Sequence, residues 1–260
     1  MRSLRFDPLW LVLGIITGTY LLFLLAMLGA TAVYSSPGDL LRALQSREIR
    51  YAIGLSVATC TATAILSLFL AVPVGYLLAR GRFPGKPWLD AALDIPIVLP
   101  PMVVGLCLLI LFQTSIGRAI ERVLPFTYTI AGVVLAQFVI GAAFAVRTMR
   151  GVFDHLSSRP EDVAMTLGCS RGQAVRMVTL PAARRGMFAA FSIAWARSLG
   201  EFGPILVFAG STRMKTEVLS TTVFLELSVG RLEAAVAVSL LMVALALAVL
   251  VAVRLVGEKI

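Results

Sequence analysis

The chain has 260 residues, of which 59% are hydrophobic and only 14% are charged. Soluble domains carry roughly a quarter charged residues, so this composition indicates an integral membrane protein. The formal net charge of +9 does not indicate nucleic-acid binding, because Lys and Arg lie beside apolar runs and form no cluster with aromatic residues. The three cysteines and the one histidine, His155, lack the spacing of a zinc site or a disulfide framework. We therefore expect no metal site and no nucleic-acid partner.

Apolar segments occur along the whole chain, and each is about 20 residues or longer, enough to cross a bilayer as a helix. No internal repeat and no linker divides the chain into further domains. The sequence predicts an all-α integral membrane protein with a single domain over residues 1–260. The six predicted spans cover about 9–33, 51–79, 89–112, 129–149, 187–209 and 232–256.

The first apolar segment follows Arg2 and Arg5, as the core of a secretory signal would. It runs from Leu9 to Val33, however, whereas a signal core is only about 7–15 residues long. We therefore expect an uncleaved first span.

The cations are distributed unequally between the two sides of the predicted spans. One side, which holds both termini and residues 150–186, carries 14 Lys and Arg residues, and the other side carries 8. Cytoplasmic loops of membrane proteins are enriched in Lys and Arg. Both termini and the loop 150–186 are therefore predicted to be cytoplasmic.

The turn after the second span, residues 80–87, carries glycine, proline and three cations, and it invites comparison with a phosphate-binding loop. The comparison fails, because Gly81 and Gly85 are one residue too close and Pro87 stands where a Ser or Thr would hold magnesium. No other segment resembles a nucleotide site. If the protein performs energised work, another chain must hydrolyse the ATP.

The third predicted span contains Pro96, Pro100 and Pro101. Each proline removes a backbone donor and kinks or breaks a helix, and the freed carbonyls need partners or a water-lined cavity at membrane depth. Either a packed kink or a bend that lines a pore fits this pattern.

The fifth predicted span contains Arg197 and Glu201, which cost about 2.5–3.5 kcal/mol each at the centre of a bilayer. The span therefore lies inside a bundle or beside water. The two charges are four residues apart and can pair on one face of a helix. A buried ion pair and a role in gating or anion passage both remain open. We predict the translocation pathway or gate at Pro100, Pro101, Arg197, Ser198 and Glu201. The helix should be interrupted at Gly203–Pro204.

A short basic insert, residues 159–185, lies between the fourth and fifth spans. Pro160 and two acids begin a predicted helix that ends at Gly168. Ser170 caps a second predicted helix, which should end at Pro181. Helices this short are not stable alone, so the insert needs neighbouring spans and a partner.

The insert resembles the cytoplasmic signature of permease subunits of ATP-binding-cassette importers. That signature is Glu-Ala-Ala, three residues, Gly, nine residues, Ile, one residue and Leu-Pro. Here Asp162-Val163-Ala164, Gly168 and Val178-Thr179-Leu180-Pro181 stand at the same spacing, with Asp for Glu and Val for Ala as departures. The resemblance implies that this loop inserts into a groove of the ATPase subunit. The residues implied to couple the two subunits are Glu161, Asp162, Val163, Ala164, Leu167, Gly168, Leu180 and Pro181.

A narrower resemblance covers residues 83–105 and 196–210, which are similar to permeases for tetrahedral oxyanions. The length of the chain and the residues 207–210 favour molybdate or tungstate over sulfate. This resemblance implies a multi-pass protein of the cytoplasmic (inner) membrane that works as a homodimer. Its partners would be two ATPase subunits, which bind the ATP and magnesium, and an extracytoplasmic substrate-binding protein. No cofactor would be bound by this chain, and no enzymatic chemistry would occur in it.

Three alternatives compete with this hypothesis: a sulfate or thiosulfate permease, a stand-alone channel or secondary transporter, and an intramembrane enzyme. The missing internal repeat argues against a secondary transporter. The missing nucleophile and base argue against an enzyme. Arg213 and Lys215 lie on the predicted outer side, where they either contact a docked binding protein or the anion, or are solvated loop residues.

Overall fold

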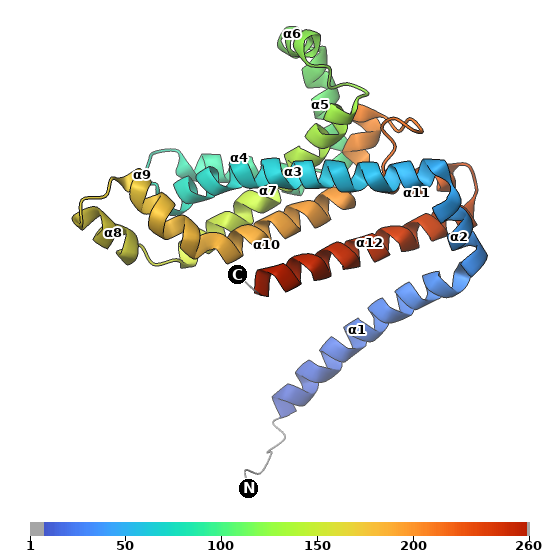
Figure 1. Cartoon of the computed structure of the whole chain (residues 1–260), viewed down its shortest axis with the longest axis horizontal. Coiled ribbons are helices and arrows are strands. Elements are labelled where there is room, and N and C mark those ends of the chain that lie inside the picture. Colours follow the sequence, from blue (N-terminus) through green and yellow to red (C-terminus); the bar gives the residue numbers. More distant parts are fainter. Residues whose placement is uncertain (1–7, 259–260) are drawn as a thin grey trace.

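The computed structural model describes residues 8–258, and every regular element in that range is a helix (Figure 1). The long helices are α1 (Pro8–Tyr34), α3 (Arg47–Arg80), α7 (Ile130–His155), α10 (Leu180–Leu199) and α12 (Leu232–Glu258). The shorter helices are α2 (Pro37–Gln45), α4 (Lys86–Val98), α5 (Pro101–Gln113), α6 (Ser115–Val123), α8 (Arg159–Thr166), α9 (Arg171–Ala174) and α11 (Leu219–Ser228). Two π-helices, η1 (Val175–Thr179) and η2 (Ile205–Ala209), precede and follow α10. The predicted all-α fold is confirmed.

Helices α3, α7 and α10 pack against one another and form the core of the molecule. Many of their buried positions are Ala, Gly, Ser or Thr, and small residues let helix backbones approach closely in a bilayer. At Gly75 of α3, a Cβ atom would lie 2.9 Å from the backbone nitrogen of Arg150 in α7. A larger residue would push the two helices apart, so α3 and α7 meet nearly backbone to backbone.

One buried polar side chain, Gln137 of α7, links the three core helices. Its Nε2 atom donates to the backbone oxygen of Ser198 in α10, and its Oε1 atom accepts from the hydroxyl of Thr63 in α3, both at 3.2 Å. The interior of a bilayer supplies no water to unsatisfied polar groups. Because both ends of the amide are bonded within the bundle, Gln137 holds the helices together.

Four of the described helices, α1, α3, α7 and α12, are long and apolar enough to cross a membrane. The pair α4–α5 is apolar enough to be a fifth span, but its two helices meet at 110°. Residues 89–112 therefore form two helices rather than one, because Pro100 and Pro101 in succession remove backbone donors. The predicted span 187–209 is not among the four, so the count of six spans stays a prediction.

The boundaries of the fifth predicted span differ from those expected. Helix α10 begins at Leu180 rather than near residue 187, and it ends at Leu199. Residues 200–202 are not helical, and η2 follows. The helix is interrupted here, but at residues 200–202 and not at Gly203–Pro204 as predicted. Gly203 and Pro204 are already helical, so the proline does not account for the break.

Figure 1 shows α8 and α9 at one end of the core bundle and α2 and α11 at the opposite end. Helix α1 contacts α12, but none of its most apolar 18-residue window is buried inside the chain. Arg2, Arg5 and Lys259, which enter the predicted orientation, lie outside the described residues.

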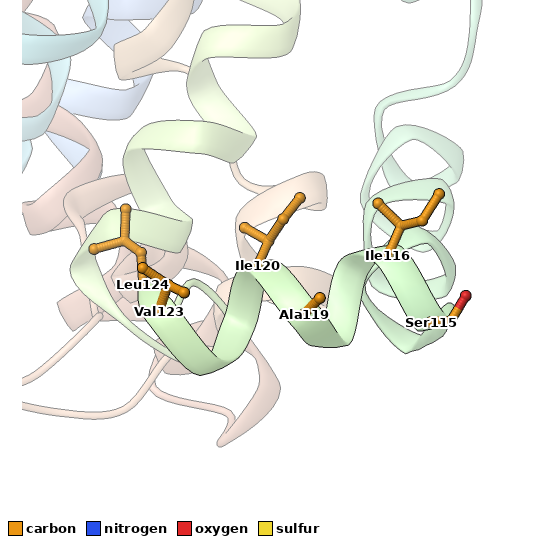
Figure 2. Close-up of a pocket in the computed structure, with 6 residues that line it drawn as sticks. All are labelled: Ser115, Ile116, Ala119, Ile120, Val123 and Leu124. Carbon is orange, nitrogen blue, oxygen red and sulfur yellow. The ribbon is translucent and has the colours of Figure 1, made fainter.

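Helix α6 follows α5 and presents an apolar face. Figure 2 shows Ile116 and Ile120 on the same side of this helix, and together with Val123 and Leu124 they line a shallow hollow of about 610 Å³. Ile116 and Val123 are exposed, so other parts of the described chain leave this face largely uncovered.

Candidate functional site

The coupling loop, residues 150–186, forms a compact helical protrusion at one end of the bundle (Figure 1). Helix α8 spans Arg159–Thr166 and has Pro160 and two acids in its first turn, so the predicted helix start is confirmed. Gly168 ends this segment with φ +95°, a conformation that only glycine adopts without strain. A Cβ atom at Gly168 would meet nothing within 4 Å. The backbone conformation, and not the available space, therefore favours glycine there.

The next turn of the loop is held by a capping box. The hydroxyl of Ser170 accepts from the backbone N–H of Gln173, and the side chain of Gln173 accepts from the backbone N–H of Ser170 at 2.8 Å. This reciprocal pair satisfies two backbone donors that the start of a helix leaves free. Ser170 is thus the predicted cap, and the capping box fixes where α9 begins.

The second predicted helix of the loop does not end at Pro181. The chain continues from α9 through η1 directly into α10, and Pro181 lies in the first turn of α10. Because the helix is continuous here, Pro181 removes an N–H that would bond to the preceding turn, and the π-helical turn before it absorbs this irregularity in the bonding pattern. The prediction that Pro181 is a stop is therefore wrong. The coupling loop is instead continuous with a core helix.

The residues predicted to couple the chain to an ATPase fall into two groups. Asp162, Val163 and Leu167 are exposed, and the side chain of Leu167 is 81% exposed. Met177 of η1 is a further large exposed apolar residue in this loop. We call these four residues the coupling surface. Exposed apolar side chains that gather on a rigid loop are typical of a protein-binding surface.

Glu161 belongs to the second group, because it is only 6% exposed. One of its carboxylate oxygens accepts from the hydroxyl of Tyr76 in α3 at 2.5 Å, and the other accepts from the hydroxyl of Thr179 in η1 at 3.0 Å. Glu161 therefore joins the coupling loop to the bundle and does not lie on the coupling surface. Ala164 and Leu180 are half-buried.

Two ion pairs that the sequence analysis missed connect α4 to α7. Arg150 pairs with Asp90, and Arg147 pairs with Asp94. Asp90 and Asp94 stand four residues apart in an otherwise apolar segment, and this spacing puts them on one face of α4. That pattern was visible in the sequence, whereas its partners on α7 were not.

The helix is interrupted at 99–100 and at 200–202, and the segments that follow the two breaks lie against each other. A Cβ atom at Gly105 of α5 would lie 2.7 Å from the Cα atom of Pro204. A Cβ atom at Gly203 would lie 3.1 Å from the backbone nitrogen of Met102. The predicted pathway residues Pro100 and Pro101 are thus close to the break that follows α10.

The predicted ion pair forms at the end of α10. The guanidinium of Arg197 lies 3.0 Å from the carboxylate of Glu201, and Glu201 is 2% exposed. The same guanidinium lies over the ring of Phe144, 5.6 Å from its centre, where a cation is attracted to the ring face. Ser198 is buried, and its hydroxyl donates to the backbone oxygen of Ala194. Ser198 therefore packs inside the bundle, whereas the side chain of Arg197 is partly exposed.

Comparison with known proteins identifies the family. The family described as "Binding-protein-dependent transport system inner membrane component" matches residues 71–260. The chain belongs to this family. It is the permease subunit of an ATP-binding-cassette importer and not itself an enzyme. The predicted permease function is therefore confirmed, which removes the channel, secondary-transporter and enzyme hypotheses.

Curated relatives match this permease over different shares of its length. The molybdate/tungstate transport system permease protein WtpB of Thermococcus kodakarensis is 34% identical over 93% of this chain and 94% of its own. The molybdenum transport system permease protein ModB of Mycobacterium bovis is 35% identical over 92% of this chain and 90% of its own. The sulfate transport system permease protein CysT of Salmonella typhimurium is 37% identical, but over 65% of this chain and 63% of its own.

Solved structures have the same fold. A chain of a bacterial importer of the acidic polysaccharide alginate superposes with a TM-score of 0.74 and 16% identity, covering 96% of each chain. A chain of the MetNI methionine transporter superposes with a TM-score of 0.62 and 20% identity, covering 83% of this permease and 99% of that chain. Both likenesses concern the fold of membrane subunits of such importers.

Proposed function

We propose that this permease carries a tetrahedral oxyanion, molybdate or tungstate, into the cell. The observation that carries the proposal is the near full-length similarity to permeases named for molybdate, tungstate or molybdenum. Sulfate is the second candidate, because sulfate permeases match with similar identity but over a shorter part of the chain.

Import of such an anion against the membrane potential requires a source of energy. Moving one elementary charge across a membrane costs about 2.3 kcal/mol per 100 mV, so a dianion that enters against an inside-negative potential meets roughly twice that cost. This permease has no nucleotide-binding motif in its sequence. We infer that two partner ATPase subunits bind the ATP and magnesium, and that an extracytoplasmic protein delivers the anion.

We further infer that two copies of this chain form the pathway between them, each with six spans and with both termini in the cytoplasm. The excess of Lys and Arg on the side of the coupling loop supports this orientation. The segments that follow the interruptions at 99–100 and 200–202 pack together near the ion pair of Arg197 and Glu201. Broken helices at membrane depth are found where they are buried in protein or line a cavity, so we place the pathway or gate there.

The coupling surface would enter the groove of the ATPase. Its motion would then pass into the bundle by two routes: through Glu161, which bonds to Tyr76 of α3, and through η1, which continues into α10. Arg197 lies in the last turn of α10 and Glu201 lies just after its end, so movement of the loop would reach the gate along one continuous helix.

Uptake by the complete transporter tests the proposed cargo. The chain, its ATPase and its binding protein are reconstituted in proteoliposomes, and ATP-dependent uptake of radiolabelled molybdate is measured with and without unlabelled competitors. We expect excess tungstate to abolish uptake and excess sulfate to leave it nearly unchanged. Uptake that sulfate suppresses as strongly as tungstate does would favour the sulfate alternative.

A further inference from the structure

A charged cavity of about 340 Å³ lies at the end of the bundle opposite the coupling loop. Segments that meet there are α2, the start of α3, the loop 210–218, α11 and the start of α12 (Figure 1). Five carboxylate residues and three arginines line it. The liquid volume of a water molecule is about 30 Å³, so the cavity has room for a long side chain.

Each arginine that lines the cavity is already paired with a carboxylate of the cavity. Arg213 lies 2.7 Å and Arg231 lies 3.6 Å from the carboxylate of Glu226. Arg42 lies 3.0 Å from the carboxylate of Asp39. Arg213, which the sequence analysis considered as a contact for a binding protein or the anion, is therefore held by Glu226.

Glu217 has no such partner, although it is the most deeply buried carboxylate of the cavity. It is 2% exposed, and its Oε2 atom has no hydrogen-bond partner. A buried polar atom without a partner costs roughly 1–3 kcal/mol. Burial raises the pKa of this carboxyl above its ordinary value, and the neighbouring acids Glu226 and Glu48 raise it further, against the opposing effects of Thr222 and Arg213. The Oε2 atom of Glu217 therefore lacks a donor.

We propose that this cavity accepts a Lys or Arg side chain of the extracytoplasmic binding protein, which donates to the carboxylate of Glu217. The inference rests on the proposed function, in which this end of the bundle lies on the extracytoplasmic side of the membrane. Charge decides the occupant: carboxylates outnumber arginines five to three among the lining residues, which disfavours the anionic cargo. Position supports a protein that docks from outside. Helices α2 and α11, whose residues line the cavity, lie at an end of the bundle (Figure 1), whereas a second copy in the same membrane packs along its side.

The test measures binding between the complete transporter and its binding protein. The transporter, with its ATPase subunits, is placed in lipid nanodiscs, and the Kd of the anion-loaded binding protein is measured by biolayer interferometry. We expect Glu217→Gln to raise the Kd by about tenfold or more, because a charged partner in a buried pair is lost. Glu121→Gln is the matched control. Glu121 belongs to α6, outside the cavity, and its carboxylate oxygen accepts from the backbone N–H groups of Phe126 and Thr127, which an amide oxygen can replace.

A double-mutant cycle separates docking from a structural effect of Glu217→Gln. Lys and Arg residues on the docking face of the binding protein are changed to Ala one at a time. One of these variants should raise the Kd with the wild-type transporter and have little further effect with Glu217→Gln. The ATPase activity without binding protein should stay unchanged in Glu217→Gln.

The outcomes distinguish this inference from the proposed function. If the wild-type transporter binds the protein and Glu217→Gln binds it within twofold of the same Kd, the inference is overturned and the proposed function stands. If Glu217→Gln instead dissociates the permease dimer, the cavity belongs to the dimer interface and the inference is overturned. If the wild-type transporter binds no such protein, both proposals fail.

Discussion

The two ends of the helical bundle each bury a glutamate, and the two glutamates are bonded differently. At the coupling end, both carboxylate oxygens of Glu161 accept hydrogen bonds from hydroxyls of the same chain. At the opposite end, the Oε2 atom of Glu217 has no hydrogen-bond partner although the residue is equally buried. A buried carboxylate that the fold satisfies holds segments in place, whereas one that the fold leaves unsatisfied has capacity for an external donor.

The surfaces at the two ends differ in the same way. The coupling end exposes apolar side chains, Val163, Leu167 and Met177, around a satisfied interior. The other end exposes charged groups around a cavity. The first kind of surface binds by burying apolar area, and the second selects a partner by charge. The molecule thus offers each side of the membrane a different kind of contact.

The largest effect is expected at the coupling surface. Leu167→Asp adds a charge where an apolar contact with the ATPase is proposed, and such positions contribute about 2 kcal/mol or more to binding. Because Leu167 is 81% exposed, the fold itself should tolerate the change. We expect the permease to lose co-purification with the ATPase and to lose ATP-driven uptake. Leu167→Met, which conserves volume, is the control, and a stable complex with Leu167→Asp would contradict the assignment.

The two buried glutamates provide the most direct test of the comparison. Glu161→Gln and Glu217→Gln are the same substitution at two similarly buried positions. We expect Glu161→Gln to destabilise the permease by about 1–3 kcal/mol, because it disturbs the hydrogen bonds to Tyr76 and Thr179. Glu217→Gln should be neutral or stabilising, because it removes a buried charge whose Oε2 atom lacks a donor. The apparent melting temperature in detergent measures both, and equal losses would break the comparison.

A smaller effect is expected from the backbone of the coupling loop. Gly168→Ala forces a Cβ atom onto a residue with φ +95°, which costs roughly 1–2 kcal/mol. Gly172→Ala is the matched control, because neither glycine has an atom within 4 Å of the added Cβ and only Gly168 has positive φ. We expect Gly168→Ala alone to lower uptake and the melting temperature. Equal behaviour of the two variants would mean that the loop tolerates another conformation.

The smallest effect concerns pH. Burial raises the pKa of Glu217 above its ordinary value of 4.5, so between these two values the folded state holds a proton that the unfolded state has released. The stability that this site contributes is therefore greatest at low pH and falls as pH rises through the raised pKa. We expect the melting temperature to fall less over this range in Glu217→Gln than in the wild-type chain. Identical pH profiles would show that Glu217 titrates normally.

Local patterns in the sequence predicted the features that depend on residues close together in the chain. Apolar runs predicted the positions of α1, α3, α7 and α12, and the residues from Pro160 to Gly168 predicted α8. Motif spacing predicted the permease family. The Arg197–Glu201 pair followed from a separation of four residues on one helix.

Features that depend on distant contacts were not predictable in this way. The angle between α4 and α5 is fixed where Gly105 meets Pro204, nearly a hundred residues away in the sequence. Pro181 has the local character of a helix stop, yet the bundle incorporates it into the first turn of α10. Glu161 was grouped with its exposed neighbours, because no local pattern reveals that Tyr76 lies beside it. These outcomes reflect tertiary packing, which overrides local propensity.

The joint between α4 and α5 has a mechanical consequence. Pro100 and Pro101 have no N–H groups, and within residues 86–113 no backbone hydrogen bond crosses from the part before Pro100 to the part after it. On one side of the joint, two ion pairs clamp α4 to α7. On the other side, α5 rests on the segment that follows α10. No backbone hydrogen bond therefore bridges the joint, and its angle is set by the fixed φ angles of the two prolines and by these contacts, which tie α4 to α7 and α5 to the segment after α10.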